Sequence, residues 1–216
     1  MQSPSRHSLP RVLRHAGLVL CPLLMALGLL ALAKSPAGEA DLWQLLAAYR
    51  ASHPTITAAM RLASDWGNIV FYPVYAVMFF LAWRRGDRGT MRLVLGYALF
   101  QLLISFLLVR VLKIALGRPR PGVDGPWTFF SLESSHNSLP SGHTAEIAGA
   151  TLPLAWRHLN RLFSLAMGLL VALVGFSRVY LGQHHMGDVI IGLVLGAFAG
   201  VCIHLFASPK RIPHAQ

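Results

Sequence analysis

The sequence predicts an all-α integral membrane protein, a bundle of six transmembrane helices with an extra helical segment at the membrane interface. Of its 216 residues, 55% are hydrophobic and 12% are charged, whereas a soluble domain carries roughly a quarter charged residues. The apolar residues gather in long runs, and the basic residues stand beside those runs. No repeat or soluble domain interrupts this pattern, so residues 1–216 are expected to form one membrane-embedded domain.

Six apolar segments approach the roughly 20 residues that a helix needs to cross a bilayer. The first begins with basic residues, as a signal sequence does, but no clear cleavage site follows, so it is expected to remain as a span. The second and fourth are short, so either their ends lie below the headgroups or their flanks are locally hydrated. The predicted spans are 16–33, 67–83, 93–112, 142–156, 162–181 and 187–207.

The basic residues orient the bundle, because Lys and Arg accumulate in cytoplasmic connections. One side of the predicted bundle carries eleven of them against a single acid, Asp87. This side is expected to be cytoplasmic, with both termini inside a bacterial-type inner membrane. Its basic residues are Arg6, Arg11, Arg14, Arg84, Arg85, Arg88, Arg92, Arg157, Arg161, Lys210 and Arg211.

Two connections on the outer side are long. In residues 34–66, apolar side chains recur at helical spacing, which indicates a helix lying in the interface and broken near Pro54. That helix either caps the bundle or guides a substrate, and the sequence leaves both readings open. Residues 118–141 are rich in Pro, Gly and Ser, which is typical of a loop. The spaced apolar residues are Leu42, Leu45, Leu46 and Tyr49.

The net charge of +11 could suggest a nucleic-acid partner. The charges are placed beside apolar segments and form no long basic run, so membrane lipids are the expected partners and nucleic acid is not. Cys21 and Cys202 both lie inside apolar runs, which favours packing roles over a disulfide or a metal site.

Polar groups that are unusual for a membrane protein fall at four span ends that all face outward. Lys113 ends the third span, "PSGH" at 140–143 opens the fourth, and Arg178 ends the fifth. His184 and Asp188 open the sixth. Titratable groups at such depth are costly in a bilayer. Counting the spans therefore predicts one site on the outer face.

Such a site suits a phosphoryl group. Ser141 starts a helix, so the amides that follow it and the positive end of the helix dipole would face an anion. Gly142 lets a ligand approach the backbone closely. Arginines donate paired hydrogen bonds to phosphate oxygens. Fixed positive charge comes from three basic residues, Lys113, Arg120 and Arg178.

Two histidines can perform different parts of the reaction. His184 and Asp188 are four residues apart, so on a helix they share a face. Asp188 would then accept from one ring nitrogen of His184 and leave the other as a nucleophile. His143, on another helix, could donate a proton to the leaving oxygen. His185 is one step round the helix and is expected to point away from the phosphate.

Three motifs in this order resemble the signature of the type-2 phosphatidic acid phosphatase family, which includes soluble vanadium haloperoxidases. They are "KIALGRPRP", "PSGH" and "SRVYLGQHHMGD". The resemblance implies that Lys113, Arg120 and Arg178 hold the phosphate, with help from Ser141 and Gly142. It also implies that His184 forms a phosphohistidine, with Asp188 orienting it and His143 as general acid, and that no metal or cofactor is needed.

The resemblance further implies a membrane enzyme that hydrolyses a lipid phosphate or diphosphate. Undecaprenyl diphosphate is the first substrate expected, and phosphatidylglycerol phosphate, phosphatidic acid and lipid A phosphate are others. One alternative is a phosphotransferase that moves the phosphoryl group onto a lipid such as lipid A. Another is a non-catalytic binder or transporter of lipid phosphates, although that function would not need His143, His184 and Asp188 together. The sequence gives no oligomeric state.

Three assignments remain open within the site. His143, Glu146, His184 and Asp188 could instead ligate zinc. Glu146 lies one turn into the fourth span on the side of His143, so it either pairs with a cation, keeps that imidazole protonated, or reaches up to water. Arg118 lacks the family spacing from Lys113 and is either an auxiliary phosphate contact or an interface anchor.

Overall fold

The structure is a computed structural model that describes residues 8–33 and 39–208, and the regular secondary structure in these ranges is helical. Three basic residues that enter the predicted topology, Arg6, Lys210 and Arg211, lie outside the described residues. The helices are α1 (Leu9–Ala33), α2 (Glu39–Ser52), α3 (Pro54–Trp66), α4 (Phe71–Arg85), α5 (Arg88–Phe100), the π-helical η1 (Gln101–Leu108), α6 (Val109–Leu116), the 3₁₀ turn η2 (Ser134–His136), α7 (Gly142–His158), α8 (Arg161–Tyr180) and α9 (Met186–Ala207).

Within the described ranges, five stretches are long and apolar enough to cross a membrane. Each overlaps one of the six predicted spans, but Pro54–Arg85 begins 13 residues before the predicted second span, 67–83. The predicted fourth span corresponds to α7, which has 17 residues and is not among them. The five stretches are Leu9–Leu32, Pro54–Arg85, Arg88–Leu116, Arg161–Tyr180 and Met186–Ala207.

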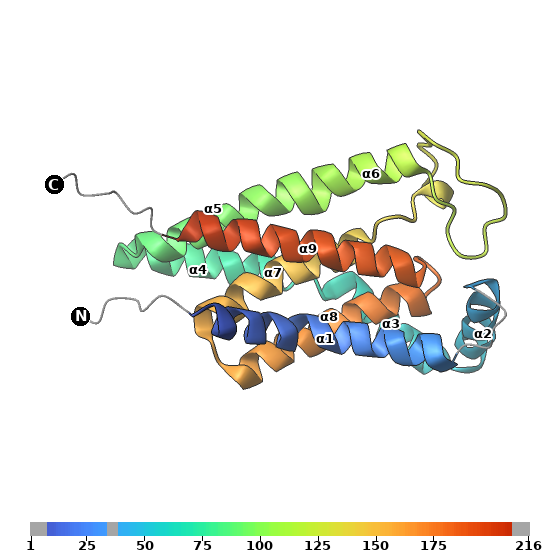
Figure 1. Cartoon of the computed structure of the whole chain (residues 1–216), viewed down its shortest axis with the longest axis horizontal. Coiled ribbons are helices and arrows are strands. Elements are labelled where there is room, and N and C mark those ends of the chain that lie inside the picture. The colour runs from blue at the N-terminus through green and yellow to red at the C-terminus, as the bar shows by residue number, and fades with distance from the viewer. Residues whose placement is uncertain (1–7, 34–38, 209–216) are drawn as a thin grey trace.

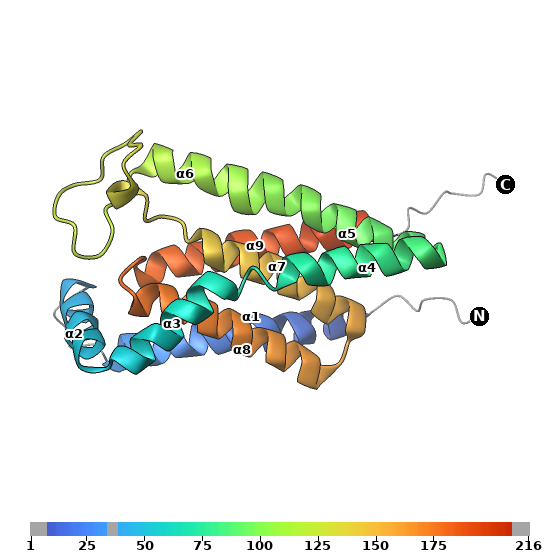
Figure 2. The same ribbon diagram turned by 180° about the vertical axis from the view of Figure 1, so that it is seen from behind.

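The helices run roughly side by side, as the two opposite views show (Figures 1 and 2). The start of α1 and the end of α9 lie at one end of the bundle. The other end carries α2, the long connection from α6 to α7, and the turn from α8 to α9. All the segments named in the predicted site therefore meet at this second end.

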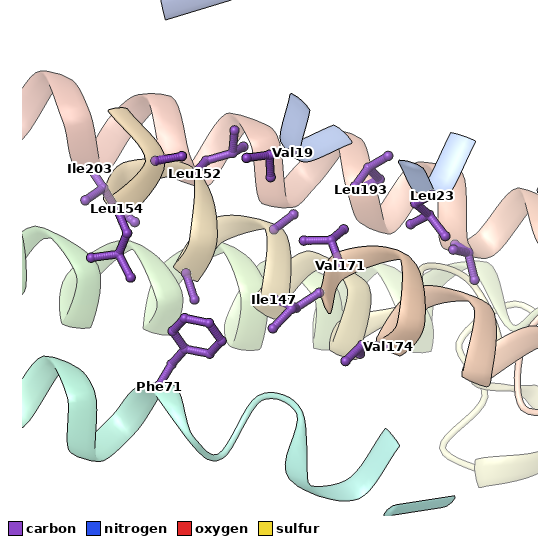
Figure 3. Packing of buried hydrophobic residues seen from close by; sticks show 14 of the residues in the cluster. Val19, Leu23, Phe71, Ile147, Leu152, Leu154, Val171, Val174, Leu193 and Ile203 are labelled. Atoms are coloured by element: carbon purple, nitrogen blue, oxygen red, sulfur yellow. The ribbon is translucent and has the colours of Figure 1, made fainter. Parts of the chain in front are cut away.

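Helix α7 lies at the centre of the packing. Most of its side chains are buried, including Ile147, Leu152 and Leu154. Figure 3 shows these three packed among apolar side chains from α1, α4, α8 and α9. A helix that is surrounded by other helices needs less intrinsic length and hydrophobicity to be held in a membrane bundle, because protein and not lipid solvates it.

The outside of the bundle is apolar. In a soluble monomer, such a large exposed apolar surface would be unusual, whereas in a bilayer it is the surface that contacts lipid. The protein is therefore a multi-pass membrane protein. Exposed side chains on this surface include Leu29, Leu102, Phe106, Leu169, Val194 and Phe198.

Local sequence sets several helix ends. Gly86, with φ of 66°, ends α4 in the left-handed conformation, and Asp87 caps α5 by accepting a hydrogen bond from Thr90 N at 3.0 Å. Pro54 occupies the first turn of α3, where its missing N–H is not needed. The predicted break near Pro54 is confirmed. Helix α3 begins there, however, whereas the sequence predicts that the connection continues to residue 66.

Candidate functional site

The predicted site residues come together at the end of the bundle that carries α2. Lys113 lies in the last turn of α6, His143 in the first turn of α7, and Arg178 in the last turn of α8. Arg120 and His184 lie in the connections that follow α6 and α8. Lys113 interacts electrostatically with both arginines, and His143 interacts with all three cations and with His184.

The start of α7 is fixed against α9 by Ser141. Ser141 is fully buried, and its backbone N–H donates to Asp188 O at 2.9 Å. Its hydroxyl accepts from Thr144 Oγ1 at 2.9 Å and does not cap the helix. The first amides of a helix have no acceptor within it. Those that follow Ser141 are therefore available to an anion.

The two site arginines are each anchored by one nitrogen. Arg178 donates from Nη1 to Ser64 Oγ, and Arg120 donates from Nη1 to Gln183 Oε1. In both side chains the buried Nε has no hydrogen-bond partner in the part of the chain that the structure describes. A buried cationic donor without an acceptor is unfavourable. An anion between the two guanidinium groups would supply the missing acceptors.

The ring of His184 is held by a backbone carbonyl. Its Nδ1 lies 2.6 Å from Ser138 O, and the side chain is only 1% exposed. A carbonyl oxygen can only accept, so Nδ1 carries the proton and Nε2 keeps its lone pair. Burial lowers the pKa of His184 to about 4, and the charge of Asp188 opposes this shift. The neutral ring thus keeps a lone pair on Nε2.

Asp188 does not hold His184 in the way that the sequence suggested. Helix α9 begins at Met186, so His184 precedes the helix and does not share a helical face with Asp188. The nearest oxygen, Asp188 Oδ2, is 3.8 Å from His184 Nδ1, which is too far for a hydrogen bond. Asp188 instead accepts from Arg118 Nη1 at 2.7 Å, from Ser138 Oγ at 2.5 Å and from His185 N at 2.9 Å.

His185 occupies a different position from its neighbour. His185 is the N-cap residue of α9, and its Nε2 lies 3.1 Å from Pro119 O. The imidazole is therefore tied to the connection after α6. That His185 points away from a bound phosphate stays a prediction.

A family model described as the PAP2 superfamily matches residues 89–212, which is more than half of the chain and contains every predicted site residue. The chain belongs to the PAP2 superfamily. The resemblance seen in the three sequence motifs is thereby confirmed.

Individual proteins show the same relationship. A lipid A 1-phosphatase from Rhizobium johnstonii is 35% identical over 108 residues, covering 48% of this chain and 43% of that protein. A lipid A 4'-phosphatase from Porphyromonas gingivalis is 26% identical, and the match covers 68% of this chain and 64% of that protein. A dolichyldiphosphatase from Saccharomyces cerevisiae is 29% identical, and the match covers 59% of this chain and 56% of that protein. The chain thus spans roughly half to two thirds of these curated relatives.

The fold also has a solved counterpart. The crystal structure of a transmembrane PAP2-type phosphatidylglycerolphosphate phosphatase from Bacillus subtilis aligns with a TM-score of 0.53. The alignment covers 86% of this chain and 94% of that one, at 23% sequence identity. The helical bundle described above is therefore a PAP2 fold.

Glu146 lies outside the three PAP2 motifs and contacts neutral donors. Its carboxylate accepts from Asn68 Nδ2 at 2.9 Å and from the hydroxyl of Tyr72. Asn68 Nδ2 also donates to His143 O at 3.2 Å, and Gln101 of η1 donates to Glu146 O at 2.8 Å. No cation pairs with Glu146 among the described ion pairs. Of the three roles left open for Glu146, pairing with a cation is therefore not found among the described residues.

The zinc reading finds no support in the donor arrangement. Among residues 8–33 and 39–208, no three His, Cys, Asp or Glu side chains are grouped so that they could hold a metal ion. Asp188 faces Arg118, and Glu146 faces Asn68 and Tyr72. These two carboxylates are directed to other partners.

A small, mostly apolar pocket lies between α2 and His184. Arg50 of α2 donates to Tyr180 O, which ties α2 to the end of α8. Helix α2 thus forms one wall beside the PAP2 site and helps to bury His184. The pocket is lined by Leu42, Trp43, Leu46, Pro121, Val179, His184, His185 and Met186.

Several residues of the site were not found from the sequence. Ser138 binds both His184 and Asp188, while Ser64 and Gln183 each anchor a site arginine. Ser138 lies in a Ser- and Pro-rich stretch where no periodicity distinguishes one residue from its neighbours. The only available signal for Gln183 was its position beside His184.

Proposed function

We propose that this protein is a membrane lipid phosphatase that hydrolyses a lipid phosphate or diphosphate through a phosphohistidine intermediate. The observation that carries the proposal is a pair of arginines, Arg120 and Arg178, each with a buried Nε that has no hydrogen-bond partner among the described residues, beside a neutral histidine whose Nε2 keeps its lone pair. This arrangement provides an anion site next to a nucleophile. Membership of the PAP2 superfamily supports the same function.

The proposed reaction has two steps. Nε2 of His184 attacks phosphorus while the bond from phosphorus to the lipid oxygen breaks, and His143 gives its proton to that oxygen. Water then attacks the phosphohistidine, the phosphorus–nitrogen bond breaks, and His143 takes a proton from the water. The products are the lipid alcohol, or a lipid monophosphate from a diphosphate, and inorganic phosphate.

The other site residues would stabilise the negative charge of the phosphoryl group. In the transition state, negative charge spreads over the equatorial oxygens of the phosphoryl group. Lys113, Arg120 and Arg178 would neutralise it, and the first amides of α7, beside Ser141 and Gly142, would donate to the same oxygens. Fixed donors in a site shielded from water are effective because they need no rearrangement during the reaction.

For the membrane arrangement, we propose six spans, with α7 as the fourth, α2 at the interface, and both termini in the cytoplasm. The site would face the outside of a bacterial cytoplasmic membrane. Undecaprenyl diphosphate is the first substrate proposed, because it appears at that face. Lipid A phosphates are the second, since two of the relatives are named as lipid A phosphatases.

The test is release of inorganic phosphate by the purified protein from a panel of lipid phosphates, with His184→Ala and His185→Ala as variants. His184→Ala should abolish turnover, because it removes the nucleophile. His185→Ala should keep much of it, because that ring is held by the backbone carbonyl of Pro119. Release that is equal in wild type and His184→Ala, or absent from every lipid, would overturn the proposal.

A further inference from the structure

Ser138 connects three parts of the site. Its backbone N–H donates to Arg118 O at 3.1 Å, and its hydroxyl donates to Asp188 Oδ2 at 2.5 Å. Its carbonyl oxygen accepts from His184 Nδ1 at 2.6 Å. Ser138, His184 and Asp188 are each at most 1% exposed. The position of the Ser138 carbonyl, and with it the ring of His184, thus depends on what holds Ser138.

Asp188 needs a cation because it is fully buried. A buried carboxylate without a partner is strongly unfavourable. Arg118 Nη1, 2.7 Å from Asp188 Oδ1, supplies that charge, and the Arg118 side chain is itself only 17% exposed. Its guanidinium carbon also lies 5.6 Å from the centre of the Trp127 ring. Arg118 is therefore fixed on two sides.

We propose that Arg118, Ser138 and Asp188 form a clamp that holds the ring of His184 in its reactive tautomer, with Arg118 and Ser138 as positioning residues. The clamp rests on the proposed function, since it serves the same nucleophile. It assigns Arg118 a role away from the phosphate. It also assigns the orienting hydrogen bond to the Ser138 carbonyl, while Asp188 acts through Ser138 and the start of α9.

The clamp also neutralises the carboxylate that lies next to the ring of His184. The charged or titratable groups around this ring are Lys113 from α6, His143 from α7, Arg178 from α8 and Asp188 from α9. Arg118 balances the carboxylate of Asp188. If Arg118 is removed, the carboxylate is left unbalanced 3.8 Å from Nδ1, and it will favour the protonated ring. The nucleophile is then lost at mildly acidic pH.

Steady-state kinetics separate this role from a direct phosphate contact. In Arg118→Gln and in Ser138→Ala, kcat should fall by about 10- to 100-fold, because a nucleophile that is misplaced by an ångström reacts that much more slowly. KM and inhibition by inorganic phosphate should stay within about threefold, because the phosphate ligands are intact. Arg118→Lys should recover part of kcat. Arg61→Gln, an exposed arginine of α3, is the matched control.

A weaker inhibition by inorganic phosphate in Arg118→Gln, with kcat preserved, would mean that Arg118 binds the phosphate and would overturn the clamp. Wild-type kcat in both Arg118→Gln and Ser138→Ala would overturn it too. Ser138→Ala keeps the backbone carbonyl and is the smaller change. It therefore tests the clamp if Arg118→Gln fails to fold.

The protonation of His184 gives a readout that simple loss of structure would not produce. NMR titration of labelled histidines, with His184→Ala to assign the signal, should show a higher titration midpoint in Arg118→Gln than in wild type. Adding Asp188→Asn to Arg118→Gln should return the midpoint toward the wild-type value. An unchanged midpoint in Arg118→Gln would refute the clamp. Because this experiment needs no substrate, it separates failure of the clamp from failure of the proposed phosphatase function.

Discussion

At the scale of single residues, His184 combines burial with one hydrogen bond to define its reactivity. Burial lowers its pKa from 6.5 to about 4, so the neutral ring persists as the pH falls from 7 toward 5 and is lost only as the pH falls through about 4. The Ser138 carbonyl selects the tautomer with Nε2 free. Wild-type enzyme should therefore hold a competent nucleophile in mildly acidic solution.

The first prediction concerns that midpoint. In substrate-free protein, the imidazole of His184 should remain neutral at pH 5.5, where an exposed histidine is mostly protonated. The NMR signal that disappears in His184→Ala identifies the residue. A midpoint for His184 near 6.5 would contradict this picture of the site.

Glu146 gives a second prediction. Glu146→Gln alters the acceptor of Asn68 Nδ2, which also donates to His143 O, so His143 should be held less firmly and kcat should fall. We expect a loss of about tenfold, short of the 10²- to 10⁴-fold contributed by a general acid itself. Tyr72→Phe, which removes a donor but keeps the carboxylate, is the matched control. An unchanged rate and pH profile in Glu146→Gln would contradict this prediction.

At the scale of helices, the site depends on how closely α9 approaches α7. A Cβ added at Gly192 would overlap Ser141 O, and one added at Gly196 would overlap Ala145 O. Both contacts are with backbone, which cannot rotate away. The two glycines therefore let α9 bring Asp188 close to the start of α7, where Ser141 N donates to Asp188 O.

A third prediction follows from this packing. Gly196→Ala should destabilise the protein by about 1–3 kcal/mol, as overpacked cores do, and it should lower kcat by separating His143 from His184. Thermal unfolding in detergent and phosphate release measure the two effects. Gly28→Ala in α1 is the control, because a Cβ there meets nothing within 4 Å. Equal unfolding temperatures for the two variants would argue against close packing of α7 and α9.

At the scale of the whole molecule, the helix ends sort into two groups. The α4–α5 and α7–α8 turns lie at the end of the bundle where α9 finishes, and the α6–α7 connection lies at the other end with the site (Figure 1). The first group carries the excess of basic residues that marks a cytoplasmic face. The charge pattern and the arrangement of the helices therefore predict the same orientation.

Cysteine labelling tests this orientation. With Cys21 and Cys202 replaced by Ala, Asp124→Cys in the α6–α7 connection should react with a membrane-impermeant maleimide added outside spheroplasts. Arg88→Cys at the start of α5 should react only after permeabilisation. Both native residues are exposed, so access to reagent is not limited by burial. The reverse labelling pattern would place the site on the cytoplasmic side.

The sequence by itself determined the helical class, the positions of most of the apolar helices and the residue types of the predicted site. Each depends on local information, namely the length of apolar runs, the spacing of short motifs and the chemistry of the side chains within them. The motifs and the span count also predicted that Lys113, His143, Arg178 and His184 would meet at one end, where the structure brings them together.

Only the tertiary structure decided which groups contact each other within that end. The His184–Ser138 bond joins residues 46 apart, and the Arg118–Asp188 pair joins residues 70 apart. The helical spacing of His184 and Asp188 predicted a direct bond, but α9 begins two residues after His184. Contacts between distant segments follow from how the helices and loops pack, and no local pattern records that packing. For this reason Arg118 and Ser138, and not the i, i+4 relation, determine how His184 is held.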